Sequence, residues 1–196
     1  NPLDGERVAG TVGPALPDVE IRVTDADDNP LKSGEVGAVQ VRGPNVFQGY
    51  WKLPEKTRED FTEDGFFDTG DQGMIDAKGY LSIIGREKDM IISGGFNIYP
   101  REIEDVLFEH PAVKDAAVIG VPHEKWGEEV KAIIVLRPDQ EASADEIIGF
   151  VKDRKGSLMA PKSVDFTDGI PLTNLGKVDK KTIRARYWEG KDRMIS

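Results

Sequence analysis

The stretch that most constrains how this chain can fold runs from residue 85 to residue 100, with the sequence GREKDMIISGGFNIYP. Charged residues lead into an apolar Met-Ile-Ile run, then into a glycine pair, and then into Pro100, which can open a helix. This order is typical of a joint between two domains. Gly94 and Gly95 carry no Cβ atom, so the backbone can approach another group closely just beyond the joint. We therefore expect a domain boundary near Lys88.

The residues before this boundary have the pattern of a β-rich domain. Residues 19–23 and 39–42 alternate between apolar and polar side chains, and a turn cluster at 25–30 separates them. Residues 54–61 predict a short helix with a proline in its first turn. Two further strands, at 66–67 and 80–84, are expected to flank a turn that contains Asp71.

The residues after the boundary predict alternating helices and strands. Ile103, Val106 and Leu107 recur at helical spacing after Pro100, and residues 116–121 and 130–136 indicate buried strands. The sequence Ser-Ala-Asp-Glu at 143–146 fits a capping box that opens a second helix, with Gly156 as its expected end. A last helix is expected from Asp179 to Tyr187. The pattern predicts an α+β fold.

Composition excludes several classes of function. The chain has 196 residues, 38% hydrophobic and 32% charged, as expected for a soluble globular protein. Its apolar runs are far shorter than the roughly 20 residues of a membrane span, so we expect no span. The lack of cysteine is compatible with a reducing cytoplasm, which is the expected location. The net charge of −10 disfavours nucleic-acid partners. With no cysteine and two histidines, we expect no metal site in this chain.

Three motifs, in order along the chain, carry a resemblance to a known family. They are FDTGD at 67–71, the 85–100 stretch, and PLTNLGK at 171–177. Together they resemble the adenylate-forming (AMP-binding) superfamily, which includes acyl-CoA synthetases, adenylation domains of peptide synthetases, and luciferases. The resemblance extends from about Val12 to Tyr187. It implies that residues 1–87 are the terminal β-subdomain of a large N-terminal AMP-binding domain. Residues 88–196 would be a small, mobile α/β C-terminal domain joined to it by a hinge.

The resemblance implies a nucleotide-binding role for Asp71 and Arg86. A carboxylate has two acceptor oxygens at the spacing of the two ribose hydroxyls, so Asp71 can bind the diol. Arg86 offers five fixed donors to ribose hydroxyls and nearby carbonyls. The alternatives are structural: Asp71 could bond the backbone of its own turn, and Arg86 could form a salt bridge at the domain boundary with Glu87 or Asp89.

The resemblance also assigns the hinge and part of a cosubstrate tunnel. Lys88 matches the residue about which the C-terminal domain of the family rotates between two half-reactions, although a plain exposed lysine is the alternative. Gly94 and Gly95 match a loop that lines the pantetheine tunnel for CoA, whereas a glycine pair by itself is more often a turn. Phe96 and Tyr99 could form the wall of the tunnel, but packing is the more common role for aromatic residues.

Lys177 matches the catalytic lysine of the family. Its ammonium group could bridge a carboxylate substrate and the α-phosphate of ATP, and so stabilise the charge that develops during adenylation. Lys162, Lys180 and Lys181 are nearby competitors that we interpret as surface charges. Glu128, in the sequence Trp-Gly-Glu at 126–128, also recurs in the family, but no chemical need for it is evident.

The chain lacks the glycine-rich triphosphate loop and the acyl pocket, which the family places upstream. The resemblance thus implies a fragment of an AMP-forming acyl-CoA synthetase that uses ATP, CoA and Mg²⁺, with the Mg²⁺ ligands and the missing N-terminal domain upstream. The fragment alone is expected to be inactive. The parent would convert a carboxylic acid into an acyl-AMP and then into an acyl-CoA.

The acyl substrate and the acceptor stay open at this point. Residues 43–51 and 54–57 are similar to malonyl-CoA synthetases, whereas residues 94–100 are equally similar to fatty acyl-CoA ligases of fatty acid metabolism. Malonate or a fatty acid is therefore the expected acid. The alternatives are an adenylation domain of a peptide synthetase, disfavoured because the chain ends soon after its last helix at Ser196, and a non-catalytic module that binds a nucleotide or a partner.

Overall fold

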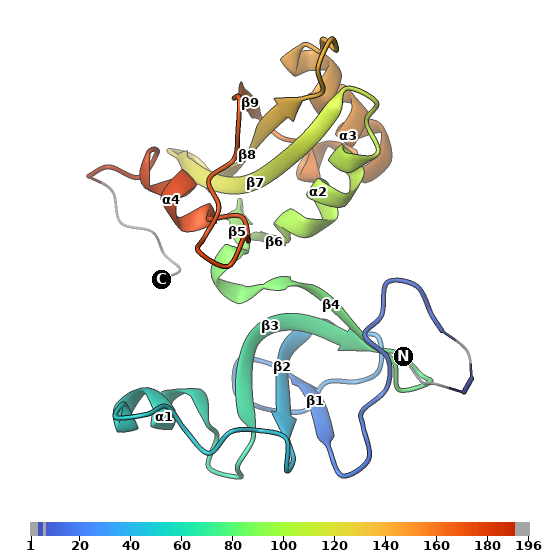
Figure 1. The fold of residues 1–196 in the computed structure, drawn as a ribbon, viewed down its shortest axis with the longest axis vertical. Helices are drawn as coiled ribbons and strands as arrows, with labels where there is room; N and C mark the ends of the chain where they lie inside the picture. The colour runs from blue at the N-terminus through green and yellow to red at the C-terminus, as the bar shows by residue number, and fades with distance from the viewer. Residues whose placement is uncertain (1–3, 6, 191–196) are drawn as a thin grey trace. The chain divides into compact units, whose positions relative to one another are not determined.

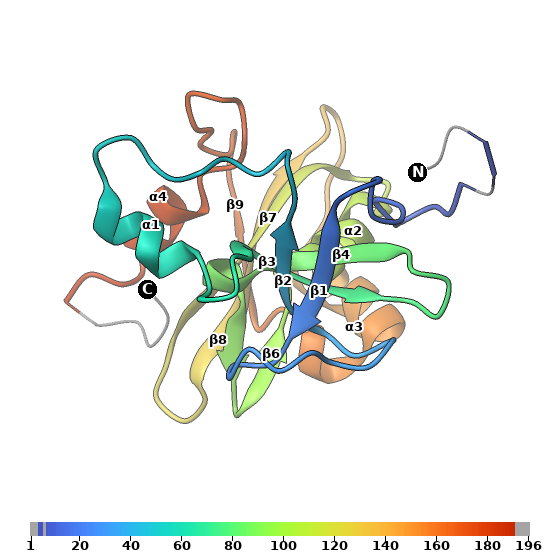
Figure 2. The same cartoon turned by 90° about the horizontal axis from the view of Figure 1, so that it is seen from below.

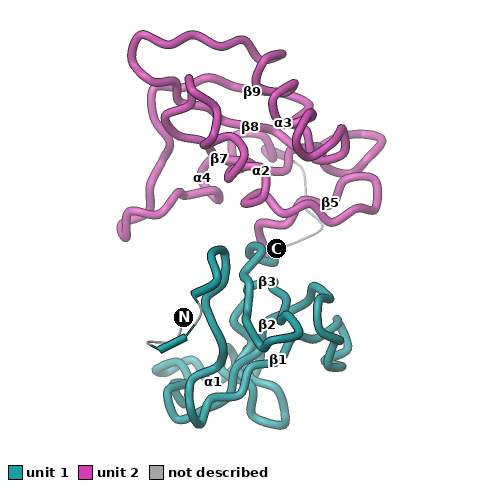
Figure 3. Tube along the Cα trace, turned by 90° about the vertical axis from the view of Figure 1, so that its right-hand side faces the viewer, with its two compact units in different colours: residues 1–87 teal, residues 88–196 magenta. Residues whose placement is uncertain are grey.

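A computed structural model describes residues 4–5 and 7–190 of the chain. These residues form two compact units, residues 1–87 and residues 88–196 (Figure 3). The chain end at Ser196, on which the argument against a following carrier domain depends, lies outside the described residues. The α+β fold class expected from the sequence is confirmed by the helices and sheets of the two units.

Unit 1 is built on an antiparallel meander of four strands. These are β1 (Glu20–Thr24), β2 (Gly37–Arg42), β3 (Phe67–Ile75) and β4 (Leu81–Arg86), paired in chain order. Figure 2 shows β1 and β2 side by side. Val23, Val39 and Leu81 form a small buried core on this sheet. The meander carries two of the predicted site residues, Asp71 on β3 and Arg86 at the end of β4.

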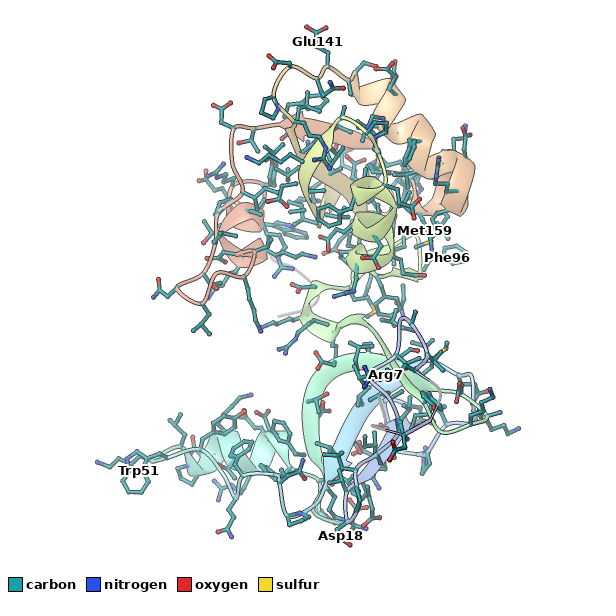
Figure 4. All side chains as sticks on the ribbon, turned by 45° about the vertical axis from the view of Figure 1, so that its right-hand side comes forward. Arg7, Asp18, Trp51, Phe96, Glu141 and Met159 are labelled. Atoms are coloured by element: carbon teal, nitrogen blue, oxygen red, sulfur yellow. The ribbon has the colours of Figure 1, made fainter. Side chains whose placement is uncertain are left out.

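A long connection in unit 1 leads from β2 to β3 and contains α1 (Pro54–Asp60). Proline at the first turn favours the start of this helix, as the sequence predicted, but the helix buries none of its residues. Four aromatic rings in and beside this connection pack edge to face or tilted with centroid distances of 4.9–5.6 Å: Phe47, Tyr50, Phe61 and Phe67. These contacts pack the connection against β3. Trp51 points away from this cluster and is 87% exposed (Figure 4).

Unit 2 is built on a mixed sheet of five strands. These are β5 (Ile91–Ser93), β6 (Phe96–Ile98), β7 (Val113–His123), β8 (Gly127–Leu136) and β9 (Ser163–Phe166). The order is β6-β5-β8-β7, and β9 also pairs with β8, in parallel. The central strand β8 therefore has β7 along one edge. Along its other edge it meets β5 at its first residue, Gly127, and β9 from Lys131 onward.

Helices cover both faces of the long β7–β8 hairpin. The helices α2 (Pro100–Phe108) and α3 (Ala144–Met159) cover one face, and α4 (Lys180–Ala185) covers the other (Figure 1). Side chains alternate across a strand, so Ala116 and Val118 pack with α2 and α3, whereas Ala117 and Ile119 pack toward α4. Burial on both faces explains why these strands read as continuous apolar runs.

The local signals for the helices of unit 2 are mostly confirmed. Ser143 and Glu146 form the reciprocal capping box at the start of α3, and Asp179 caps α4 by accepting the N–H of Thr182 at 3.0 Å. The expected break at Gly156 is confirmed, because this residue has the non-helical angles φ 80° and ψ 171°. A further short helical segment follows the kink, so that α3 as a whole extends to Met159.

Candidate functional site

Asp71 lies within a strand and not in a turn between two strands, so that prediction was wrong. The register of β3 against β2 shifts at this point: Gln40 pairs with Asp68, whereas Ala38 already pairs with Gln72. Residues 69–71 therefore bulge opposite a single residue of β2, and Gly70 supplies the positive φ of 67° that the bulge needs. A turn-like sequence inside an alternating strand produces a bulge, which re-aims the side chain that follows it.

Asp71 and Arg86 lie directly opposite each other on β3 and β4. The Nε atom of Arg86 is 2.8 Å from Oδ1 of Asp71, and the two side chains are 50% and 26% exposed. Arg86 therefore does form a salt bridge, but the partner that the structure shows is Asp71 and not one of the two carboxylates considered from the sequence. The pair remains accessible to solvent, and the second oxygen of Asp71 and the outer nitrogens of Arg86 extend its capacity for hydrogen bonds to a ligand.

Lys88 lies in a short 3-10 turn, η1 (Glu87–Asp89), at the start of unit 2. Arg184 of α4 donates through Nη1 to the carbonyl oxygen of Lys88 at 3.2 Å and to Oδ1 of Asp89 at 2.9 Å. The side chains of Arg184 and Asp89 are only 14% and 20% exposed. The sequence analysis missed Arg184, because the only local signal was a basic residue in the last turn of a short helix.

Gly94 and Gly95 form the turn of a tight hairpin. Ser93 pairs with Phe96, so the two glycines alone connect β5 to β6. Their φ angles are +59° and +85°, and a two-residue hairpin turn of type I′ requires a positive φ at both positions. The turn interpretation, which the sequence analysis kept beside the tunnel interpretation, is thus the one that the backbone adopts. A turn can also line a binding site, so the second interpretation stays a prediction.

A pocket of about 450 Å³ lies beside this hairpin within unit 2. Its lining consists of Ser93, Gly94, Phe96, Trp126, Ser157, Leu158 and Lys162. The walls are largely apolar, and Lys162 adds a cationic side chain, so the pocket offers apolar contact together with a single positive charge. Lys162, which we interpreted as a surface charge, therefore lines a cavity and also donates to the carbonyl oxygen of Ser157.

Two aromatic residues define this pocket in different ways. Phe96 is 58% exposed and projects from unit 2 (Figure 4), so it does not have the packing role expected from the sequence. The ring of Trp126 stacks on His123 with a centroid distance of 4.4 Å and an interplanar angle of 13°. The Nδ1 atom of His123 accepts the N–H groups of Lys125 and Trp126, both at 3.2 Å. These contacts hold the indole in one orientation at the wall of the pocket.

Lys177 lies in an exposed loop that leads into α4. The loop is closed at its base by a bridge between Leu172 and Val178, and Thr173 donates its N–H to the carbonyl oxygen of Lys177 at 2.7 Å. The backbone N–H of Lys177 in turn donates to Oγ1 of Thr173 at 3.2 Å. The backbone at Lys177 is therefore fixed, while its side chain remains exposed to solvent.

The predicted site residues are divided between the two units. Unit 1 brings Asp71 and Arg86 together, and unit 2 contains Lys88, which the resemblance assigns to a hinge, together with the glycine hairpin and Lys177. Among the described residues, no group of three or more His, Cys, Asp or Glu side chains could hold a metal ion. Within the same part of the chain, no helix is long and apolar enough to cross a membrane.

Comparisons with known proteins show what this arrangement resembles. Residues 102–177 match the model of the AMP-binding enzyme C-terminal domain, and residues 1–51 match the model of the AMP-binding enzyme. The medium/long-chain-fatty-acid–CoA ligase FadD8 of Mycobacterium tuberculosis is 50% identical, over 89% of this chain and 32% of that protein. The feruloyl-CoA synthase of an Amycolatopsis species is 42% identical, over 94% of this chain and 38% of that protein.

Solved structures agree with these sequence matches. MatB from Rhodopseudomonas palustris, solved with ATP bound, has a TM-score of 0.90 and 46% identity, covering 95% of this chain and 37% of MatB. The amide bond synthetase McbA from Marinactinospora thermotolerans has a TM-score of 0.84 and 39% identity, covering 91% of this chain and 36% of McbA.

The fold and the two family matches define the closing part of an AMP-binding domain followed by the C-terminal domain of such enzymes. The chain belongs to the family of AMP-binding, adenylate-forming enzymes, and its relatives include acyl-CoA ligases. It spans about a third of the length of the curated relatives that it matches, 32% of one and 38% of another. The resemblance stated from the three sequence motifs is thus confirmed.

Proposed function

We propose that this chain is part of an ATP-dependent acid–thiol ligase, which converts a carboxylic acid into an acyl-AMP and then transfers the acyl group to CoA. The first step releases pyrophosphate and the second releases AMP. The observation that carries this proposal is the solvent-accessible Asp71–Arg86 pair, with 2.8 Å between Nε and Oδ1, on the four-stranded sheet of unit 1.

In the proposed mechanism, the Asp71–Arg86 pair holds the ribose. The ion pair fixes the rotamer of each side chain before a nucleotide arrives, so little ordering is needed on binding. The carboxylate then accepts hydrogen bonds from the two ribose hydroxyls, and Arg86 donates to the sugar from the side. Oδ1 of Asp71 can serve Arg86 and a hydroxyl at once, because each carboxylate oxygen has two acceptor positions.

Lys177 is the proposed catalytic residue of the first step. Its exposed ammonium group would contact the carboxylate of the acid and the α-phosphate, where negative charge builds up as the new C–O–P linkage forms. The backbone bonds between Lys177 and Thr173 support this role, because they fix the base of the side chain. Losing one such electrostatic contact typically lowers the rate by ~10²–10³.

Unit 2 is proposed to serve the second step as well. The pocket beside Gly94 supports this, because a narrow pantetheine arm can pass against a glycine hairpin, and Lys162 can meet a phosphate of CoA. The acid stays unresolved between malonate and a fatty acid. Mg²⁺, if used, would be held by residues outside the described part of this chain, which offers no cluster of ligands.

A second candidate is amide formation, in which an amine replaces the thiol. The similarity to the amide bond synthetase McbA, at 39% identity, favours it specifically. Both reactions share the adenylation step, so they differ only in the nucleophile that attacks the acyl-AMP. Supplying the intact protein with an acid, ATP and either CoA or an amine distinguishes them, because only the correct acceptor produces AMP together with a new acyl product.

The test of the proposed function is pyrophosphate release by the intact protein with a panel of carboxylic acids. We expect a signal that depends on the acid and falls by ~10²–10³ in Lys177→Ala, whereas the exposed neighbour variant Lys181→Ala stays near wild type. Thioester formation from supplied acyl-AMP should survive in Lys177→Ala. A folded protein that releases no pyrophosphate with any acid would refute the proposal. The 196-residue chain alone is expected to be inactive, because its sequence contains no triphosphate loop.

A further inference from the structure

Glu128 is a buried carboxylate that the proposed mechanism does not use. It is 6% exposed and lies on β8, on the same face of the strand as the core residues Val130 and Ala132. A carboxylate among apolar side chains is costly unless hydrogen bonds satisfy it. The hydrogen bonds of this carboxylate therefore indicate the role of Glu128.

One of its partners is the backbone of the strand that carries the glycine hairpin. Oε2 of Glu128 accepts the N–H of Ile92 at 3.1 Å, although the two residues are 36 positions apart. Strand β8 pairs with β5 through its backbone only at Gly127, opposite Ser93. At the next residue of β8 the backbone pairing with β5 has stopped. There the side chain of Glu128 takes the place of a β8 backbone carbonyl as the acceptor for the N–H of β5.

Three successive residues of the Trp-Gly-Glu motif thus hold the last two residues of β5 and the first residue of the turn. Trp126 accepts the N–H of Gly94 at 2.9 Å through its carbonyl oxygen, Gly127 pairs with Ser93, and Glu128 accepts the N–H of Ile92. Ser93, Gly94 and Trp126 all line the 450 Å³ pocket. The motif therefore sets the position of one wall of the pocket relative to the other.

Gly120 on β7 provides the space for the carboxylate. A Cβ atom at Gly120 would lie 2.5 Å from Oε2 and 2.9 Å from Cδ of Glu128. Gly120 does not have a positive φ, so its backbone conformation does not require glycine. Glycine is required because Glu128 occupies the space that a side chain would take. The side chain of Glu128 and the missing side chain of Gly120 act as a complementary pair.

We propose that Glu128 is a positioning residue, which holds the Gly94-Gly95 hairpin in place for attack of the thiol on the acyl-AMP. This inference rests on the proposed function, because it assigns the hairpin to the second half-reaction. Glu128 touches no reacting atom. Adenylation is assigned to Asp71, Arg86 and Lys177 instead, so the two half-reactions should respond differently to the loss of Glu128.

The test compares three variants of the intact protein. Glu128→Ala removes the acceptor, Glu128→Gln keeps an acceptor oxygen without the charge, and Gly120→Ala displaces the carboxylate without removing it. Glu124→Gln, in the exposed turn between β7 and β8, is the matched control. Pyrophosphate release without CoA reports adenylation, and thioester formation from supplied acyl-AMP reports the second step.

We expect kcat/KM for CoA to fall by ~10- to 100-fold in Glu128→Ala and Gly120→Ala, because misplacing a binding element by about 1 Å can cost ~10²-fold. Pyrophosphate release should change by less than about twofold, and Glu128→Gln should recover most of the loss. Equal loss of both half-reactions, or no loss in either, would overturn the proposal. The Gly120→Ala variant keeps the test decisive if Glu128→Ala fails to fold.

Hydrogen exchange of the backbone amides at 92–94, followed by mass spectrometry in the same intact proteins, provides a readout independent of activity. Exchange there should accelerate about tenfold or more in Glu128→Ala and stay unchanged in Glu124→Gln. If the wild type forms neither product, the proposed function fails, and the positioning role in thiol transfer fails with it. Unchanged exchange in Glu128→Ala would instead refute the positioning role of Glu128 while leaving the proposed function intact.

Discussion

The guanidinium of Arg184 donates to the main-chain carbonyl oxygen of Lys88 at 3.2 Å, across 96 positions of the sequence. The same nitrogen contacts Oδ1 of Asp89 at 2.9 Å. The last helix of unit 2 therefore holds the first residues of that unit. If Lys88 is the hinge, as the resemblance predicts, this hydrogen bond holds the hinge residue to unit 2.

We expect Arg184→Ala to destabilise unit 2 by about 2–3 kcal/mol. The substitution leaves the carboxylate of Asp89, at 20% exposed, without this cationic partner, and hydrogen bonds to charged groups contribute about 1.5–3 kcal/mol. Urea unfolding followed by the fluorescence of Trp126 and Trp188 measures this, with Trp51→Phe as the background that removes the signal of unit 1.

The exposed residue Arg186 provides the matched control, because Arg186→Ala removes the same charge from the same helix end. A double-mutant cycle of Arg184→Ala with Asp89→Ala should show a coupling of about 1 kcal/mol or more. Equal effects of Arg184→Ala and Arg186→Ala would mean that the contact with the hinge segment contributes nothing.

Asp71→Asn is expected to raise KM for ATP about 10- to 100-fold in the intact protein. The neutral amide loses the ion pair with Arg86 and accepts only one of the two hydroxyl bonds, and each such charge-assisted bond contributes about 1.5–3 kcal/mol. The 2′,3′-dideoxy form of ATP isolates the contact with the ribose. The variant should discriminate less between the two nucleotides than the wild type does, whereas Glu63→Gln, an exposed residue of unit 1, should not.

Gly94→Asn is expected to leave the stability of the hairpin unchanged while it impairs binding of CoA in the pocket. Asparagine tolerates the positive φ of 59° and is favoured at the first position of a type I′ turn, so stability should change by less than about 0.5 kcal/mol. The side chain would project beside Trp126, because a Cβ atom there lies 3.7 Å from Cδ1 of that ring.

KM for CoA should therefore rise in Gly94→Asn, while pyrophosphate release stays near wild type. Gly95→Asn is the companion variant, because a Cβ atom at Gly95 meets nothing within 4 Å. A normal KM for CoA in Gly94→Asn would contradict the assignment of the hairpin to the thiol step.

The stability of unit 2 should decline at high pH through Tyr187. Burial, together with a hydrogen bond from its hydroxyl to Asp165, raises the pKa of Tyr187 from 10.0 to about 12. A group whose pKa is raised on folding contributes stability that is complete below its unfolded pKa and is lost as the pH rises through the folded value. The contribution of Tyr187 should thus be complete below pH 10 and disappear as the pH approaches about 12.

The measurement is the free energy of unfolding of wild type and Tyr187→Phe between pH 8 and pH 12. The wild type should be more stable by about 1.5 kcal/mol at pH 8, and the difference should vanish toward pH 12. Lys131, 2.8 Å from Asp165, is present in both proteins. A difference that is independent of pH would show that the hydroxyl bond adds no stability.

Local signals in the sequence predicted much of the fold. The capping box of Ser143 and Glu146, Pro54 and Pro100 at helix starts, and the apolar strands of β7 and β8 all depend on residues within a few positions of one another. The family was also evident from three short motifs. These features are available to any reader of the sequence, because backbone propensity and capping act between near neighbours.

The same local reasoning placed Asp71 in a turn, whereas the structure places it in a bulge of β3. A glycine with positive φ between polar residues has the same signature in both settings. The pairing of β3 with β2 and β4 decides between them, and that pairing involves residues that are distant along the chain.

The sequence by itself determined the family, the fold class, the helix starts and the chemistry available at Asp71, Arg86 and Lys177. Only the tertiary structure decided that Glu128 bonds the backbone of Ile92 and that Arg184 bonds the carbonyl oxygen of Lys88. The physical reason is that buried polar groups must find partners wherever packing brings them, and those partners lie 36 and 96 residues away.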